Sequence, residues 1–244
     1  MSWRIARGCP LVTPVIHVTS TRQALENASI AADLGADGVW LISHQGDDDA
    51  LVPLADAVVA RHPGLVVGVN FLGSTAGQAL TNIAASGSHA ITGYWSDNAG
   101  IVDDEVELAE ADAAERGASG WTGSYFGGVA FKYQRTPTDL EQTCRAATRF
   151  VDVVCTSGPG TGAAADVDKI AQIRAAIGDH PLAIASGITP SNVVDYLDLV
   201  DVFMVATGIS RSFDQLDATL TSELVRHVQD YREGQSSANN ESSA

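Results

Sequence analysis

Short apolar runs recur along the chain at intervals of about 30 residues, which is the length of a strand–helix–strand unit. Runs of this length that are rich in Val, Ile and Leu are typical of buried strands, and the amphipathic segments between them are typical of helices. We expect strands at residues 11–18, 37–43, 65–71, 89–95, 119–134, 151–156, 181–186 and 201–207. Helices are expected at residues 20–35, 50–62, 76–86, 103–117, 137–150 and 166–178, briefly after Thr189-Pro190, and at 215–232.

Strict alternation of strands and helices indicates an α/β protein with a parallel sheet. Eight such units within 244 residues predict a single-domain TIM (β/α)8 barrel over residues 1–233. The alternative is an open, doubly wound sheet, which usually has fewer strands. Residues 234–244 are polar and poor in apolar side chains, so we expect a disordered tail there.

The composition argues against a membrane-spanning protein and against a secreted one. No apolar run approaches the roughly 20 residues that span a bilayer, and the first residues lack the apolar segment of a secretory signal. Cytoplasmic location is therefore expected. The three cysteines, Cys9, Cys144 and Cys155, have no metal-ligand spacing and are interpreted as reduced thiols.

The chain is strongly acidic, with a formal net charge of −16 and only two lysines, Lys132 and Lys169. This charge argues against nucleic acid or an anionic membrane surface as the main partner. A salt-rich cytoplasm or a GC-rich genome would each account for the surplus of Asp over Lys. We expect a phosphorylated small molecule as the partner; self-association into a homo-oligomer stays open.

Three of the later strands end in turns rich in Gly, Ser and Thr. Such turns present free backbone N–H groups to an anion, and in many barrels the turns after strands 7 and 8 bind phosphate. The same turns could instead serve only as tight connections. The predicted phosphate ligands are Thr156, Ser157, Gly158, Gly160, Ser186, Gly187, Thr207 and Gly208.

In a (β/α)8 barrel the reacting groups lie where the strands end. Lys132 falls within an apolar run, where it could pair with a phosphate or carboxylate, act as a base or form a Schiff base. It could also extend to solvent at the end of its strand. His17 also interrupts an apolar strand and could be a core histidine. The predicted catalytic residues are Lys132, His17, Asn70, Asp47 and Asp97.

Other polar residues at the strand ends carry weaker signals. His44, Asp48 and Asp49 are interpreted as a solvated loop, although these acids could take a metal. Cys155 has no base near it in the sequence and is interpreted as a small buried residue. No cofactor and no metal is required by the sequence.

The chain resembles the BtpA/SgcQ family of TIM-barrel proteins over most of its length. The shared features are His17 within VIHV, ALENA in the first helix, Gly46-Asp47, GVN at 68–70, Lys132, TSGPGTG at 156–162 and SGITPSNV at 186–193. The chain departs from the family pattern after His17, before Gly46, after Lys132 and after strand 8. The resemblance implies a phosphate-binding barrel and does not specify a reaction.

From these features we expect an enzyme that acts on a phosphorylated sugar or a nucleotide-like small molecule. Isomerisation, glycosidic cleavage and lyase chemistry are all compatible with the predicted residues. The alternative is a non-catalytic assembly or regulatory protein of the BtpA type that retains a phosphate pocket. Replacing Lys132 with alanine would separate the two hypotheses. The substitution should abolish turnover if the protein is an enzyme, and should leave partner binding intact if it is an assembly or regulatory protein.

Overall fold

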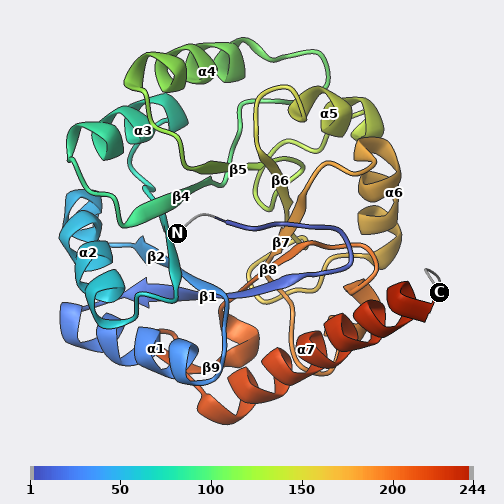
Figure 1. Cartoon of the computed structure of the whole chain (residues 1–244). Helices are drawn as coiled ribbons and strands as arrows, with labels where there is room; N and C mark the ends of the chain where they lie inside the picture. The colour runs from blue at the N-terminus through green and yellow to red at the C-terminus, as the bar shows by residue number, and fades with distance from the viewer. Residues whose placement is uncertain (1–2, 242–244) are drawn as a thin grey trace.

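The computed structural model describes residues 3–241, which form a closed barrel of eight parallel strands surrounded by helices (Figure 1). The predicted TIM (β/α)8 fold is therefore confirmed. The barrel closes where β1 pairs with β8, with Leu11 beside Val202 and Pro14 beside Val205. The strands are β1 (Leu11–Val18), β2 (Gly38–Ser43), β3 (Val66–Asn70), β4 (Ile91–Ser96), β5 (Ser124–Gly128), β6 (Val153–Thr156), β7 (Leu182–Ala185) and β8 (Val202–Val205).

The helices cover the outer face of the barrel and bury its apolar side chains (Figure 1). Among the described residues they are α1 (Thr21–Asp33), α2 (Leu51–Arg61), α3 (Ala76–Ala85), α4 (Glu107–Ser119), α5 (Leu140–Ala147), α6 (Val167–Ile177) and α7 (Ala218–Glu241). Short 3-10 turns form η1 (Asp48–Ala50), η2 (Val193–Tyr196) and η3 (Thr207–Ile209). No described helix combines the length and the apolar composition that crossing a bilayer requires.

Aromatic rings fill the barrel interior. Trp3 stacks on Trp40 with ring centroids 4.8 Å apart, and Trp40 meets Phe126 at 4.7 Å and Trp95 at 6.2 Å. The inner wall gives these rings room at Gly68, because a Cβ there would overlap the Trp40 ring. The N-terminal segment, which carries Trp3, crosses the centre of the ring of strands in Figure 1. The interior is thus a packed core and not a pore.

Three aspartates that immediately precede strands fasten the opposite end of the barrel. Asp37, Asp152 and Asp201 each accept the backbone N–H that opens a neighbouring strand, from Val12, Tyr125 and Leu182. Each also pairs with arginine: Asp37 with Arg232, Asp152 with Arg116, and Asp201 with both Arg174 and Arg7. This repeated arrangement ties strands to helices at the end remote from the mouth.

Two segments before α4 and α5 differ from the prediction. Residues 103–106 form a turn held by the bridge between Val102 and Glu105, so α4 begins at Glu107. The helix expected after Thr136-Pro137 begins only at Leu140, because Asp139 is the N-cap and accepts from Gln142 N. The side chain of Asp103 accepts the N–H groups of residues 138 and 139 and holds them outside the helix.

The end of the chain also differs. Residues 210–216 form a hairpin of β9 (Ser210–Ser212) and β10 (Gln215–Leu216), and α7 follows it. Helix α7 continues to Glu241, so residues 234–241, predicted to be a disordered tail, are helical in the structure. No proline interrupts this segment, and extending an existing helix costs much less than nucleating a new one. Residues 242–244 lie outside the described residues.

Candidate active site at the barrel mouth

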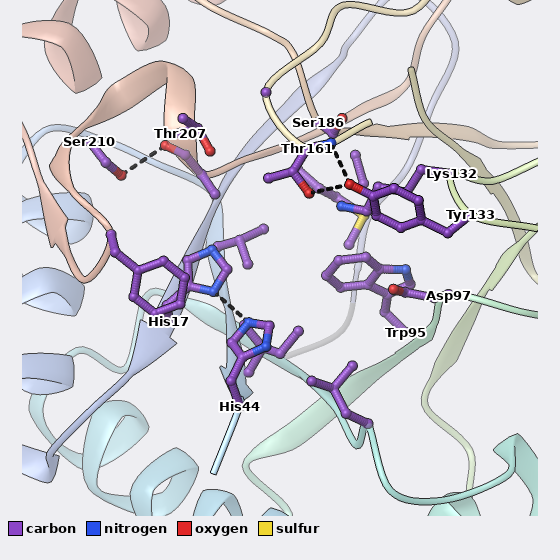
Figure 2. Close-up of a pocket in the computed structure, with 18 of the residues that line it drawn as sticks. His17, His44, Trp95, Asp97, Lys132, Tyr133, Thr161, Ser186, Thr207 and Ser210 are labelled. Atoms are coloured by element: carbon purple, nitrogen blue, oxygen red, sulfur yellow. Dashed lines mark hydrogen bonds between the residues drawn. The ribbon is translucent and has the colours of Figure 1, made fainter. Parts of the chain in front are cut away.

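A cavity of about 580 Å³ opens at the carboxyl ends of the strands (Figure 2). This volume lies within the range of small-molecule sites. Five residues predicted from the sequence line it, and they come from five different strand ends or the loops that follow them. They are His17, Asp97, Lys132, Ser186 and Thr207.

Asp97 follows β4 and is the only carboxylate among the residues that line this cavity. Burial raises its pKa, and the Lys132 ammonium and a hydrogen bond from Asn70 oppose this effect. Asn70 Nδ2 donates to Asp97 Oδ1 at 3.0 Å. Asn70 is 1% exposed and does not line the cavity, so it orients Asp97 from behind, whereas the sequence placed it facing the reacting atoms.

Lys132 lies in a turn after β5, not within a strand as predicted. The strand ends at Gly128, where a Cβ would overlap the carbonyl of Asp97, and Ala130 and Tyr133 have positive φ angles of 47° and 63°. Non-glycine residues rarely adopt this conformation, and strain of this kind often accompanies functional sites. The Lys132 side chain is partly buried and lines the cavity.

The other lysine fastens this turn. Lys169 Nζ donates to the carbonyls of Ala130 and Ser157, at 2.7 and 2.8 Å, and Ser157 Oγ accepts from Lys132 N at 2.7 Å. Thr156 Oγ1 also donates to Ala130, at 3.4 Å. Thr156 and Ser157, predicted as phosphate ligands, are fully buried and do not line the mouth cavity. They support the Lys132 turn instead.

His17 and His44 meet side by side, with His17 Nδ1 3.0 Å from His44 Nε2, so one ring donates to the other (Figure 2). His44 is exposed but lies in the cavity wall, which differs from the solvated loop that the sequence suggested. Burial, followed by the charges of His44 and Lys132, lowers the pKa of His17 from 6.5 to about 4. His17 is therefore a neutral imidazole at pH 7.

The lowered pKa of His17 predicts a loss of stability in mild acid. Between pH 6.5 and 4 the unfolded chain binds a proton at His17 that the folded protein does not, so the free energy of unfolding falls as the pH falls. Allowing for the exposed part of the ring, we expect wild type to lose about 1–2 kcal/mol more than His17→Gln between pH 7.5 and pH 5. Urea unfolding at both pH values measures this difference. Equal losses in the two proteins would contradict it.

The loops after β6, β7 and β8 form one side of the cavity through Thr161, Gly162, Ser186 and Thr207. Ser186 has a φ of 102°, and its hydroxyl donates to Gly160 O at 3.0 Å. Together with close packing at Gly158, Gly187 and Gly208, this contact holds the loops against one another.

Four predicted phosphate-binding glycines do not line the mouth cavity. A Cβ at Gly158 or Gly187 would overlap Ala163 O, and one at Gly208 would overlap Ile188 O. Gly160 contributes the carbonyl that accepts from Ser186. Close approach between loops therefore explains Gly158, Gly187 and Gly208 without a ligand.

Asp47, predicted as an acid or base, lies outside the cavity. Its side chain is exposed and accepts from Ser43 Oγ, and its carbonyl accepts from Ala50 N in η1. These bonds cap the loop after β2. Within residues 3–241 no three His, Cys, Asp or Glu side chains gather as they would around a metal ion.

Several lining residues were not among the predicted site residues. Trp95 lines the cavity (Figure 2), and the Tyr133 hydroxyl accepts from Thr161 N. Arg211 and Phe213 belong to the unpredicted β9–β10 hairpin. The position of Trp95 at the end of a strand was a usable signal, whereas nothing in the local sequence distinguishes the hairpin from a polar turn.

The charge of the cavity is opposite to that of the protein. Lys132 and Arg211 line it together with a single carboxylate, Asp97, although the whole chain carries a net charge of −16. A local excess of positive charge beside hydroxyls and loop backbone suits an anion of small size. Arg211 is held by Gln215, to which its guanidinium donates.

Solved structures that are similar to the chain share its TIM-barrel fold at low sequence identity. The native KDPGal structure has a TM-score of 0.66 at 14% identity, covering 96% of this chain and 100% of that one. Phosphoribosyl anthranilate isomerase from Thermus thermophilus has a TM-score of 0.62 at 15% identity, covering 90% and 98%. Orotidine 5′-monophosphate decarboxylase from Methanocaldococcus jannaschii, complexed with the inhibitor BMP, has a TM-score of 0.61 at 12% identity, covering 91% and 98%.

No protein-family model matches the chain, and no curated protein sequence does. The resemblance to the BtpA/SgcQ family therefore stays a prediction. The similar structures establish the TIM-barrel fold.

Proposed function

We propose that the protein is an enzyme that acts on a phosphorylated sugar or a nucleotide-like small molecule at the barrel mouth. The observation that carries the proposal is the set of residues that line one cavity. Lys132, Asp97 and His17 lie in its wall. Ser186 and Thr207, in the loops after β7 and β8, also line it. Phosphate in many TIM barrels is bound at these loops. Two of the similar structures, the isomerase and the decarboxylase, have names that denote phosphorylated compounds.

The proposed phosphate site uses the residues of the three loops that face the cavity. Thr161, Ser186 and Thr207 line it, and Arg211 adds a positive charge. The glycines predicted as ligands contribute by bringing the loops together. A phosphate here would be held mainly by hydroxyls, backbone N–H groups and one guanidinium.

The proposed chemistry uses Asp97 and Lys132 together. Because burial raises the pKa of Asp97, its carboxyl group is better suited to exchange a proton with substrate than an exposed aspartate is. The Lys132 ammonium would stabilise negative charge that develops on a substrate oxygen. His17, neutral at pH 7, can accept or donate one hydrogen bond to the substrate. Isomerisation, glycosidic cleavage and lyase reactions can each use such a pair.

A thermal-shift screen tests this proposal with phosphosugars and nucleotides, each paired with its dephosphorylated form. At a concentration about ten times Kd, a true ligand should stabilise the protein by about 1.4 kcal/mol, which raises the Tm of a protein of this size by roughly 3–6 °C. The dephosphorylated partner should give little shift, and Arg211→Gln should reduce the shift of the phosphorylated compound. If no phosphorylated compound exceeds its partner at millimolar concentration, the proposal fails.

A further inference from the structure

Phe213 is an exposed aromatic residue held in place over the cavity. Its side chain is 62% exposed, yet its ring stacks on His17 with centroids 4.5 Å apart and an interplanar angle of 26°. It also lies beside His44, at 5.6 Å between centroids. The exposed part of this fixed ring offers a flat apolar surface at the edge of the cavity.

The hairpin that carries Phe213 is fastened to α1. Asp214 O accepts from Gln23 Nε2 at 2.5 Å and from Asn27 Nδ2 at 2.7 Å, and Leu216 N donates to Asn27 Oδ1 at 3.2 Å. Gln23 and Asn27 are themselves buried. The fold therefore fixes the position of the hairpin and keeps the Phe213 ring at the edge of the cavity.

Trp95 provides a second aromatic surface in the same cavity. It is only 4% exposed, yet it is one of the residues that line the cavity wall. Its indole N–H is enclosed by protein atoms, so a ligand in the cavity would contact the ring of Trp95 and not its N–H. The surface offered to a ligand here is therefore flat and apolar.

Much of the remaining wall is apolar, with Val15, Ile42, Leu72 and Met204 among the lining residues. A simple phosphosugar carries a hydroxyl on most of its carbons, and against such a wall several hydroxyls would lose water without gaining a partner. A planar ring has the opposite balance, because its faces are apolar and its edge carries few polar atoms.

We propose that the cavity takes a phosphate ester that bears a planar ring, with Phe213 and Trp95 contacting the ring while the loops hold the phosphate. This inference rests on the proposed function, since the phosphate loops are half of the site. It selects, within the class proposed above, ring-bearing esters such as nucleoside 5′-monophosphates over bare phosphosugars. It also makes Phe213 a specificity residue.

The test compares the affinities of five probes by isothermal titration calorimetry: inorganic phosphate, ribose 5-phosphate, uridine, uridine 5′-monophosphate and adenosine 5′-monophosphate. At least one of the two nucleotides should bind the wild-type protein about 10-fold or more tightly than ribose 5-phosphate, because stacking on an aromatic side chain adds roughly this much. Uridine alone should bind more weakly than uridine 5′-monophosphate.

Phe213→Ala is the main variant, because an exposed side chain can be removed without disturbing the core. It should lower the affinity for the nucleotide about 5- to 20-fold and change the affinity for ribose 5-phosphate less than 2-fold. Phe213→Tyr keeps the ring and should bind like wild type. Trp95→Phe keeps a ring but reduces its area, and should lower nucleotide affinity less than Phe213→Ala does.

The outcomes separate this inference from the proposed function. If ribose 5-phosphate binds as tightly as both nucleotides, or if Phe213→Ala weakens all phosphorylated probes equally, the ring-binding inference is overturned and the phosphate site stands. If uridine binds as tightly as its phosphate, the ring site stands and the phosphate site fails. If no probe binds at 10 mM, both are overturned.

Discussion

Lys132→Ala is expected to reduce turnover by at least about 100-fold, because removing a group that stabilises developing charge in a closed site has effects of this size. The ammonium lines the cavity, and its charge acts on both Asp97 and His17. The Tm should stay within about 2 °C of wild type, since Lys132 has no salt bridge among the described residues. Turnover of a compound found by the thermal screen is measured by phosphorus NMR.

The chain provides a matched control in its other lysine, Lys169. Replacing Lys169 should lower the Tm, whereas replacing Lys132 should not. Lys169 Nζ donates to the carbonyls of Ala130 and Ser157, so Lys169→Ala should lower the Tm by removing a charged donor from both acceptors. If Lys132→Ala turns over substrate normally, Lys132 has no catalytic role. If no turnover is found for wild type while a partner protein binds both wild type and Lys132→Ala, the assembly or regulatory alternative is favoured.

The barrel could be predicted from the sequence because its signal is repeated eight times. Each apolar run lies where a strand forms, and errors of a few residues at the ends do not change the topology. Once the barrel is predicted, the strand ends must converge at one mouth. This is why Asp97, Lys132 and Ser186, far apart in the sequence, could be placed in one cavity.

The orientation of individual side chains at the strand ends could not be predicted. Asn70 ends β3 but lies behind Asp97, and Ser157 follows β6 but supports the Lys132 turn. A shift of one residue in a strand reverses which side chain faces the interior, and the sequence does not determine register to that accuracy. The positive φ angles of Ala130 and Tyr133 are likewise invisible in the sequence, because neither residue favours them.

The β9–β10 hairpin was missed for a different reason. Its strands have three and two residues, and the contacts that hold it are made by Gln23 and Asn27, nearly two hundred residues away. Local periodicity cannot report such contacts. Phe213 is therefore a cavity-lining residue that only the three-dimensional structure identifies.

Asp201→Ala is expected to be among the most destabilising single substitutions in the chain. Asp201 is 1% exposed; its Oδ2 accepts from Arg174 Nη2 at 2.5 Å and from Leu182 N at 2.9 Å, and its Oδ1 accepts from Arg7 Nη1 at 3.0 Å. Removing the carboxylate leaves the Arg174 charge and a strand N–H buried without their partner. Such a loss costs about 3–5 kcal/mol, which corresponds to a fall in Tm of roughly 6–20 °C for a protein of this size.

The two other aspartates of the same arrangement test whether burial sets the size of this effect. The side chain of Asp37 is 25% exposed and that of Asp152 is 45% exposed, and each pairs with a single arginine. Thermal unfolding of the three alanine variants should therefore give losses in the order Asp201, Asp37, Asp152. Glu26→Ala, which breaks an exposed pair with Arg22, should change stability by less than about 0.5 kcal/mol. Equal losses at Asp201 and Asp152 would mean that the strand hydrogen bond shared by all three aspartates, and not the buried charge, determines the stability of this end of the barrel.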